Sequence, residues 1–275
     1  MEKTAKPKLN FNTALETSLK IPGIRVDRTT FLTKRFSERV SSSTLEKIIK
    51  DGPYSAGISK NEIDNIAKSL IQKRTITSST QSFAAGLPGG IAMAGTIPAD
   101  MLQFFGTALK LAQELAYLYG HKDLWLEEHL DTEKARDHLI LYLGVMFGVS
   151  GSTSAIKFVS SGLASTIAKK LPQKALTQTI YYPIIKKVAA MIGIKVNKDI
   201  FAKSVSKLVP VIGGLVSGTI TYSTMKPMGK RLSTALSESL DLSKEDIIKE
   251  YRNMKTEFPD IIDIDFEEIV EEGHN

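Results

Sequence analysis

The sequence predicts an all-α protein with a single helical, bundle-like domain. Three observations lead to this prediction. Apolar residues recur at helical spacing along most of the 275 residues, whereas no segment alternates as a β-strand does. Helix start and stop signals, chiefly Ser, Asp, Gly and Pro, separate these segments. The apolar content of 42% is ordinary for a globular protein, and the length allows an ample core.

The first third of the chain is expected to contain four helices. Each has apolar residues on one side, and sequences rich in Pro and Gly end the first and the third. Ser59 and Glu62 form a capping-box pattern that begins the fourth helix. The expected ranges are 9–20, 28–40, 43–50 and 59–83.

A central helix is expected from Pro98 to about Gly120. Proline at the first helical position loses no hydrogen bond. Five polar side chains of this helix fall on one narrow stripe, and the rest of its surface is apolar. The helix should therefore be buried on most sides, with the stripe facing water, a polar groove or partner side chains. A satisfied polar seam is the favoured interpretation of the stripe, and a catalytic pocket is the alternative. The stripe consists of Asp100, Gln103, Thr107, Lys110 and Glu114.

Asp100 lies in the first turn of this helix among apolar residues. A carboxylate in such surroundings must be compensated or it takes up a proton. The helix N-terminus supplies only part of that compensation. We therefore expect a second partner for Asp100, and the basic residues of 151–236 are its expected source.

The second half of the chain is also expected to be helical. From Thr132 a helix should continue through the uncharged residues 139–156 and past Lys157 to about Lys170. A later helix is expected to be interrupted at Pro183, and Ser243 is expected to cap the last one. These later segments are 174–192, 199–208, 208–225 and 243–254.

Three apolar segments contain glycines four residues apart. On a helix this spacing puts both glycines on one face, where a second helix can approach closely. We expect either tight packing in a helical core or, as the alternative, hairpins that insert into a membrane. The pairs are Gly86 and Gly90, Gly144 and Gly148, and Gly214 and Gly218.

Charge is distributed unevenly, although the net charge is only +6. Residues 151–236 contain thirteen Lys and Arg against Asp199 alone, and residues 237–275 are strongly acidic. The acidic tail could lie over the basic region, or the basic region could meet anionic lipid headgroups. Nucleic acid fits the charge, but no binding motif accompanies it, so we expect no nucleic-acid partner. The basic surface is assigned to Lys169, Lys170, Lys174, Lys186, Lys187, Lys230 and Arg231.

No motif for a reaction is convincing. The Gly-rich stretch before Pro98 lacks the Lys-Ser/Thr ending of a phosphate-binding loop. His129, Glu133 and Asp137 are four residues apart, as metal ligands on a helix can be, but a helix start falls between them. We therefore expect no catalytic residue, no metal and no cofactor, although an enzyme with a polar pocket around Asp100 stays an alternative.

One long stretch carries a family resemblance. The sequence GLPGGIAMAGTIPADMLQFFGTALKLAQELAYLYG, residues 86–120, resembles the signature of the EcsC family of bacterial proteins. LILYLGVMFGVSG and VPVIGGLVSGTITYSTMKPMGKRL, residues 139–151 and 209–232, are similar to it too. The resemblance implies an all-helical bacterial protein that is often encoded near membrane transport or secretion functions. It implies no reaction and no catalytic residue.

Together these features predict a helical domain over residues 9–256 and an acidic tail over 257–275. The first residues contain no apolar signal sequence, so we expect a cytoplasmic protein that lies peripherally at the inner face of the membrane. Its expected partners are anionic lipid or a membrane transport or secretion protein. A membrane-inserting, pore-like protein is the alternative.

Overall fold

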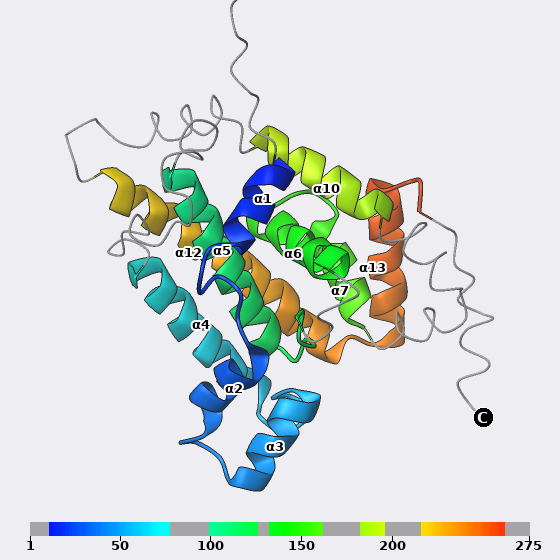
Figure 1. Ribbon diagram of the computed structural model, residues 1–275. Helices are drawn as coiled ribbons and strands as arrows, with labels where there is room; N and C mark the ends of the chain where they lie inside the picture. Colours follow the sequence, from blue (N-terminus) through cyan, green and yellow to red (C-terminus); the bar gives the residue numbers. More distant parts are fainter. Residues whose placement is uncertain (1–10, 78–98, 126–131, 162–181, 196–215, 262–275) are drawn as a thin grey trace, which may run out of the picture.

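A computed structural model describes residues 11–77, 99–125, 132–161, 182–195 and 216–261. The protein is all-helical, as predicted, and its helices pack against one another in a single domain (Figure 1). The described residues form α1 (Phe11–Leu19), α2 (Arg28–Phe36), α3 (Ser42–Asp51), α4 (Lys60–Thr77), α5 (Ala99–Leu118), α6 (Thr132–Phe147), α7 (Ser152–Ser160), α10 (Tyr182–Lys195), α12 (Val216–Glu238), the 3₁₀ helix η4 (Ser239–Asp241) and α13 (Lys244–Glu257).

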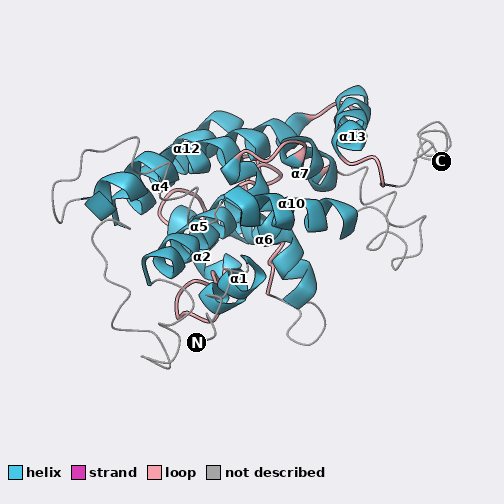
Figure 2. Ribbon diagram, turned by 90° about the horizontal axis from the view of Figure 1, so that it is seen from above, coloured by secondary structure: helices cyan, strands magenta, loops and turns pink. Residues whose placement is uncertain are grey.

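Helix α5 lies at the centre of the molecule. It contacts α1, α2, α4, α6 and α12, and these helices surround it in Figures 1 and 2. Every residue from Leu111 to Tyr119 is buried, on all sides of the helix. Alanines 108, 112 and 116 recur every four residues, so they share a face on which neighbouring chain segments can come close. The polar side chains of α5 must therefore find partners inside the protein.

The close approach of α12 to α4 and α5 depends on a glycine that does not belong to the pairs spaced four residues apart. A Cβ atom at Gly229 of α12 would lie 3.0 Å from Ile71 of α4 and 3.1 Å from Leu111 of α5. The absence of a side chain at Gly229 therefore lets α12 settle against both helices. Gly144 is buried in α6. Gly86, Gly90 and Gly214 lie outside the described residues, and the surroundings of Gly218 in α12 are not described.

Gly148 was assigned wrongly to a helix-packing face. It follows the last residue of α6, is exposed and has a φ of +65°. Its N–H donates to Val145 O at 3.0 Å, and Val149 N–H donates to Gly144 O at 2.8 Å. This pair of hydrogen bonds is a Schellman cap, which requires a left-handed residue after the helix. The spacing of four between Gly144 and Gly148 thus reflects helix termination.

The expected continuous helix through residues 139–156 is therefore interrupted. Gly151 also has a positive φ, of +77°, and α7 begins after it. Two left-handed glycines within four residues turn the chain between α6 and α7. No described helix is long and apolar enough to cross a membrane.

The predicted boundary at residue 256 lies too early. Ser243 and Asp246 form a reciprocal capping box at the start of α13, which ends at Glu257. Phe258 and Ile261 beyond it are each only 2% exposed and belong to the core. The domain therefore includes at least residues 257–261, because apolar burial there contributes to its stability.

Replacing Gly148 by alanine should destabilise the protein. An L-residue in the left-handed region costs about 1 kcal/mol relative to glycine. The free energy of unfolding in urea should fall by about that amount for Gly148→Ala. Gly148→Asn should lose less, since asparagine tolerates this conformation better. Equal stability of the alanine variant and the wild type would contradict the cap.

Two truncations test the corrected boundary. A chain that ends at residue 261 should keep the unfolding free energy of the full chain, apart from small changes. A chain that ends at residue 256 should lose about 3 kcal/mol or more, because it lacks the buried Phe258 and Ile261. Denaturant unfolding measures both. If the shorter chain is as stable as the longer one, residues 257–261 do not belong to the core.

Candidate functional site

The polar stripe of α5 is partly occupied by internal contacts. Thr107 is buried, and Lys110 Nζ donates to the carbonyl oxygen of Gly23 at 2.6 Å. Glu114 forms a two-point ion pair with Arg74 of α4, in which Arg74 Nε lies 2.7 Å from Glu114 Oε2. The side chains of Asp100 and Gln103 lie outside the described ones, so the expected partner of Asp100 stays a prediction.

A further polar residue of α5, Gln113, lies outside the stripe and was missed because its neighbours in the sequence are apolar. It is fully buried, yet its amide is well satisfied. Its Oε1 accepts from Val26 N–H at 3.0 Å and from Trp125 Nε1–H at 2.9 Å. Its Nε2 donates to the carbonyl oxygens of Ile24 and Leu109. The only signal in the sequence was a glutamine on the apolar side of a helix, which must be hydrogen-bonded when buried.

A polar cluster around His121 connects α5, α6 and α7. Tyr142 OH lies 2.8 Å from His121 Nδ1, and Ser160 Oγ lies 3.2 Å from His121 Nε2. Arg28 Nε donates to the carbonyl oxygen of His121 at 2.8 Å. Burial, with smaller contributions from His138 and Arg28, lowers the pKa of His121 to about 3. With its pKa lowered in this way, His121 is a weak base at neutral pH, and both of its ring nitrogens are held by hydroxyl groups.

The His121 cluster makes stability depend on pH. The pKa of histidine is about 6.5 in an unfolded chain, so as pH falls the unfolded state binds the proton first. The contribution of neutral His121 is fully present above pH 6.5 and is lost as pH falls toward 3. The loss at pH 4 should reach up to about 3 kcal/mol.

Urea unfolding at pH 7 and pH 4 measures this dependence. His121→Gln keeps hydrogen-bonding groups but does not titrate, so it should show a smaller loss between the two pH values. His138→Gln is the matched control, since it removes a second histidine whose ring lies 6.3 Å from that of Tyr142 and which interacts electrostatically with His121. If wild type and His121→Gln lose the same stability, the buried imidazole is not responsible.

An open groove lies where α6, α7 and α12 meet. Its volume is about 420 Å³. Val145, Pro227 and Ala235 give it an apolar floor, and the hydroxyl-bearing Thr153 and Thr234 border it. The remaining residues that line it are Gly148, Lys230, Arg231 and Glu238. Three residues singled out in the sequence, Gly148, Lys230 and Arg231, are thus brought together here.

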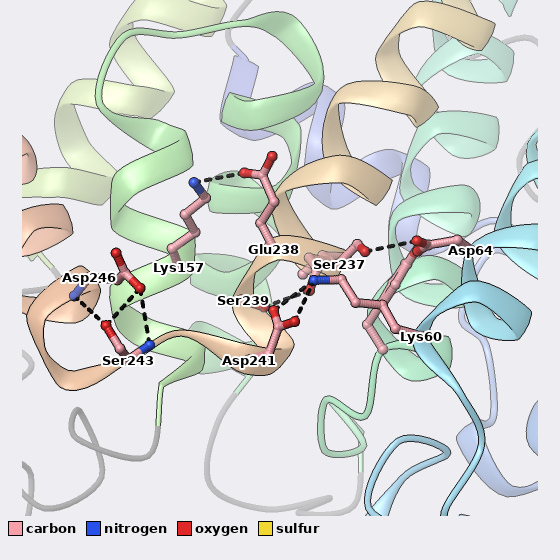
Figure 3. Close-up of polar contacts among 11 residues, drawn as sticks. Lys60, Asp64, Lys157, Ser237, Glu238, Ser239, Asp241, Ser243 and Asp246 are labelled. Atoms are coloured by element: carbon pink, nitrogen blue, oxygen red, sulfur yellow. Dashed lines mark hydrogen bonds and ion pairs between the residues drawn. The ribbon is translucent and has the colours of Figure 1, made fainter.

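Some charged side chains of the groove have partners among the described residues, and one has none. Glu238 lies 2.8 Å from Lys157 of α7, and Figure 3 shows the two side chains pointing toward one another. Burial lowers the pKa of Lys157, but the carboxylates of Glu238 and Glu250 outweigh burial and raise it overall. Arg231 Nη1 donates to the carbonyl oxygen of Met146 at 3.0 Å, in the last turn of α6.

Lys230 and Arg231 are both exposed at the groove, and Lys230 differs from Arg231 in its lack of a partner within the described residues. Among the described residues it makes no hydrogen bond and no ion pair. Lys157 is shared by Glu238 and Glu250, so these three groups together carry one net negative charge. With Lys230 and Arg231 added, the groove keeps an excess of about one positive charge. The groove thus combines apolar surface, hydroxyl groups and a cationic rim, which suits an anionic group attached to an apolar one.

The other basic residues that the sequence assigned to the surface do not line this groove. Lys186 and Lys187 are exposed on α10. Lys187 Nζ donates to the carbonyl oxygen of Glu257 and lies 5.0 Å from the centre of the Phe258 ring. Lys169, Lys170 and Lys174 lie outside the described residues.

His129, Glu133 and Asp137 have a metal-ligand spacing, although the sequence predicted no metal, and the described residues do not test this grouping. The side chains of His129 and Glu133 lie outside the described part of the chain, and Asp137 lies 3.7 Å from Arg136. No group of three His, Asp or Glu side chains that could hold a metal occurs among the described residues.

Comparison of the chain with protein-family models, curated proteins and solved structures finds no match. The resemblance to the EcsC family therefore stays a prediction. The function has to be argued from the geometry.

Proposed function

We propose that this chain is a non-enzymatic protein that binds anionic lipid headgroups at the cytoplasmic face of a membrane. The groove between α6, α7 and α12 is the proposed site of contact. The observation that carries the proposal is the position of Lys230, which is exposed at the rim of a groove with an apolar floor.

The charge of α12 supports this role. Lys226, Lys230 and Arg231 are all exposed on this helix, within six residues of sequence. Residues four apart on a helix lie on the same face, so Lys226 and Lys230 are neighbours there. Each Lys or Arg near an anionic membrane contributes about 1 kcal/mol of binding free energy, and salt screens that attraction. Binding through this helix is therefore expected to depend on ionic strength.

Polar and apolar features of the groove act together in the proposal. A headgroup phosphate could meet Lys230 and the hydroxyl groups of Thr153 and Thr234, while Val145 and Ala235 contact carbon atoms of the lipid. Arg231 is held by Met146 O, so its role includes support of the α6 terminus. Lys230, which makes no such contact within the described residues, is the better position for a test.

Co-sedimentation with vesicles tests the proposal. The protein should bind vesicles of phosphatidylglycerol and phosphatidylcholine at low salt, and high salt should release it. Vesicles of phosphatidylcholine alone should bind it weakly. Lys230→Glu reverses one charge and should weaken binding to the anionic vesicles about tenfold or more.

Lys50→Glu is the matched control. It makes the same charge change at an exposed residue of α3, which projects with α2 from the lower end of the molecule in Figure 1. This variant should bind anionic vesicles nearly as well as the wild type. Failure to bind at low salt, or equal weakening by the two substitutions, would refute a specific groove. Retention on the vesicles after a carbonate wash would instead favour the membrane-inserting alternative.

A further inference from the structure

A second group of cations gathers around the buried carboxylate of α5. Glu114 is nearly inaccessible, with 3% of its side chain exposed, and it is paired with Arg74 of α4. Lys110 lies one turn before Glu114 on the same helix. Arg35, in the last turn of α2, interacts electrostatically with both Glu114 and Arg74. Three cations from three helices thus share one carboxylate.

The three cations of this cluster carry more positive charge than the nearby negative groups offset. Arg35 and Arg74 lie in the last turns of α2 and α4, where each helix dipole supplies the equivalent of roughly half a negative charge. Together with Glu114, these helix ends offset about two of the three positive charges. The segment that connects α4 to α5, residues 78–98, contains no Asp or Glu. An excess of about one positive charge therefore remains, before exposed Arg39 beyond α2 is counted.

Within the described residues, the same cations retain unused hydrogen-bond donors. Arg74 uses Nε and Nη2 on Glu114, which leaves its other N–H groups available. Lys110 uses one donor on Gly23 O, and an ammonium group has three. Among the described residues, the guanidinium of Arg35 makes no hydrogen bond, and it lies 5.5 Å from the centre of the Phe31 ring. Planar guanidinium groups and a lysine form the donor set that phosphate groups prefer.

Electrostatics within the cluster agree with this geometry. Burial lowers the pKa of Lys110, and Arg74 lowers it further against the opposing effect of Glu114. Burial likewise lowers the pKa of Arg35, Glu114 opposes this, and Arg74 and Arg39 act in the same direction as burial. The charged forms of Lys110 and Arg35 are thus destabilised in this environment, and a bound anion would stabilise them.

We propose that Arg35, Arg74 and Lys110 form a binding site for a phosphate group, either free phosphate or a phosphate monoester. Glu114 fixes the orientation of Arg74 and leaves its outer donors for the ligand. This site lies on α2, α4 and α5, so the proposal is independent of the groove on α6, α7 and α12.

Calorimetric titration with inorganic phosphate at constant ionic strength tests the site. The wild type should bind phosphate, and Arg35→Gln should raise the dissociation constant about tenfold or more, as expected when one charged hydrogen-bond donor is lost. Arg35→Lys keeps the charge but loses the planar donor pair, so it should give an intermediate value. Sodium chloride at the same ionic strength should give no comparable heat.

Two control variants locate the binding. Lys249→Gln removes an exposed cation from α13 and should bind phosphate as the wild type does. Lys230→Glu alters the groove and tests whether phosphate binds there instead. If Lys230→Glu abolishes the binding and Arg35→Gln does not, phosphate occupies the groove and this inference is overturned, while the proposed function stands. Absence of binding, or equal binding by wild type and Arg35→Gln, also overturns it.

Vesicles that contain phosphatidic acid distinguish the two sources of phosphate. If Arg35→Gln lowers binding to these vesicles as it lowers binding to inorganic phosphate, the site accepts a phosphate monoester on a lipid. If it lowers only the binding of inorganic phosphate, the site serves a free phosphate. Circular dichroism of Arg35→Gln and Arg35→Lys confirms that both variants fold.

Discussion

The burial of α5 on all sides from Leu111 onward is the constraint on which the rest of the structure depends. Polar side chains in this enclosed part of the helix, Gln113 and Glu114, cannot reach water, so each must meet a partner from a neighbouring segment. Gln113 consequently holds Ile24, Val26 and Trp125 in place, and Glu114 fixes α4 through Arg74. The polar groups of one helix thereby position the loop before α2 and the segment after α5.

Glycines at helix ends position the remaining elements around this centre. Gly120 closes α5 with the same pair of hydrogen bonds that Gly148 makes at α6, and both have a positive φ. A Cβ atom at Gly52 would lie 2.7 Å from the Cα atom of Gly120, so the end of α3 rests directly on the backbone after α5. The Gly148 cap also leaves the α6 terminus beside Arg231, at the edge of the groove.

Much of the local structure could be predicted from the sequence. Helical spacing of apolar residues indicated the helices, and Ser243 marked the start of α13 because its hydroxyl caps that helix. The polar stripe on α5 was visible from spacing alone. The same reasoning misassigned Gly148, because a spacing of four serves close packing and a helix end equally well. It also placed the domain boundary before Phe258, since acidic composition near a terminus says little about which apolar residues are buried.

The sequence by itself determined the all-helical class, most helix starts and the excess of positive charge, since these depend on neighbours within a few residues. Only the tertiary structure decided which charges meet. It paired Glu114 with Arg74 across forty residues and placed Lys230 at the rim of an apolar groove. Such contacts follow from how helices cross, which depends on the shapes of whole faces. A single residue such as Gly229 can set that geometry without any periodic signal, because its effect lies in the atoms it lacks.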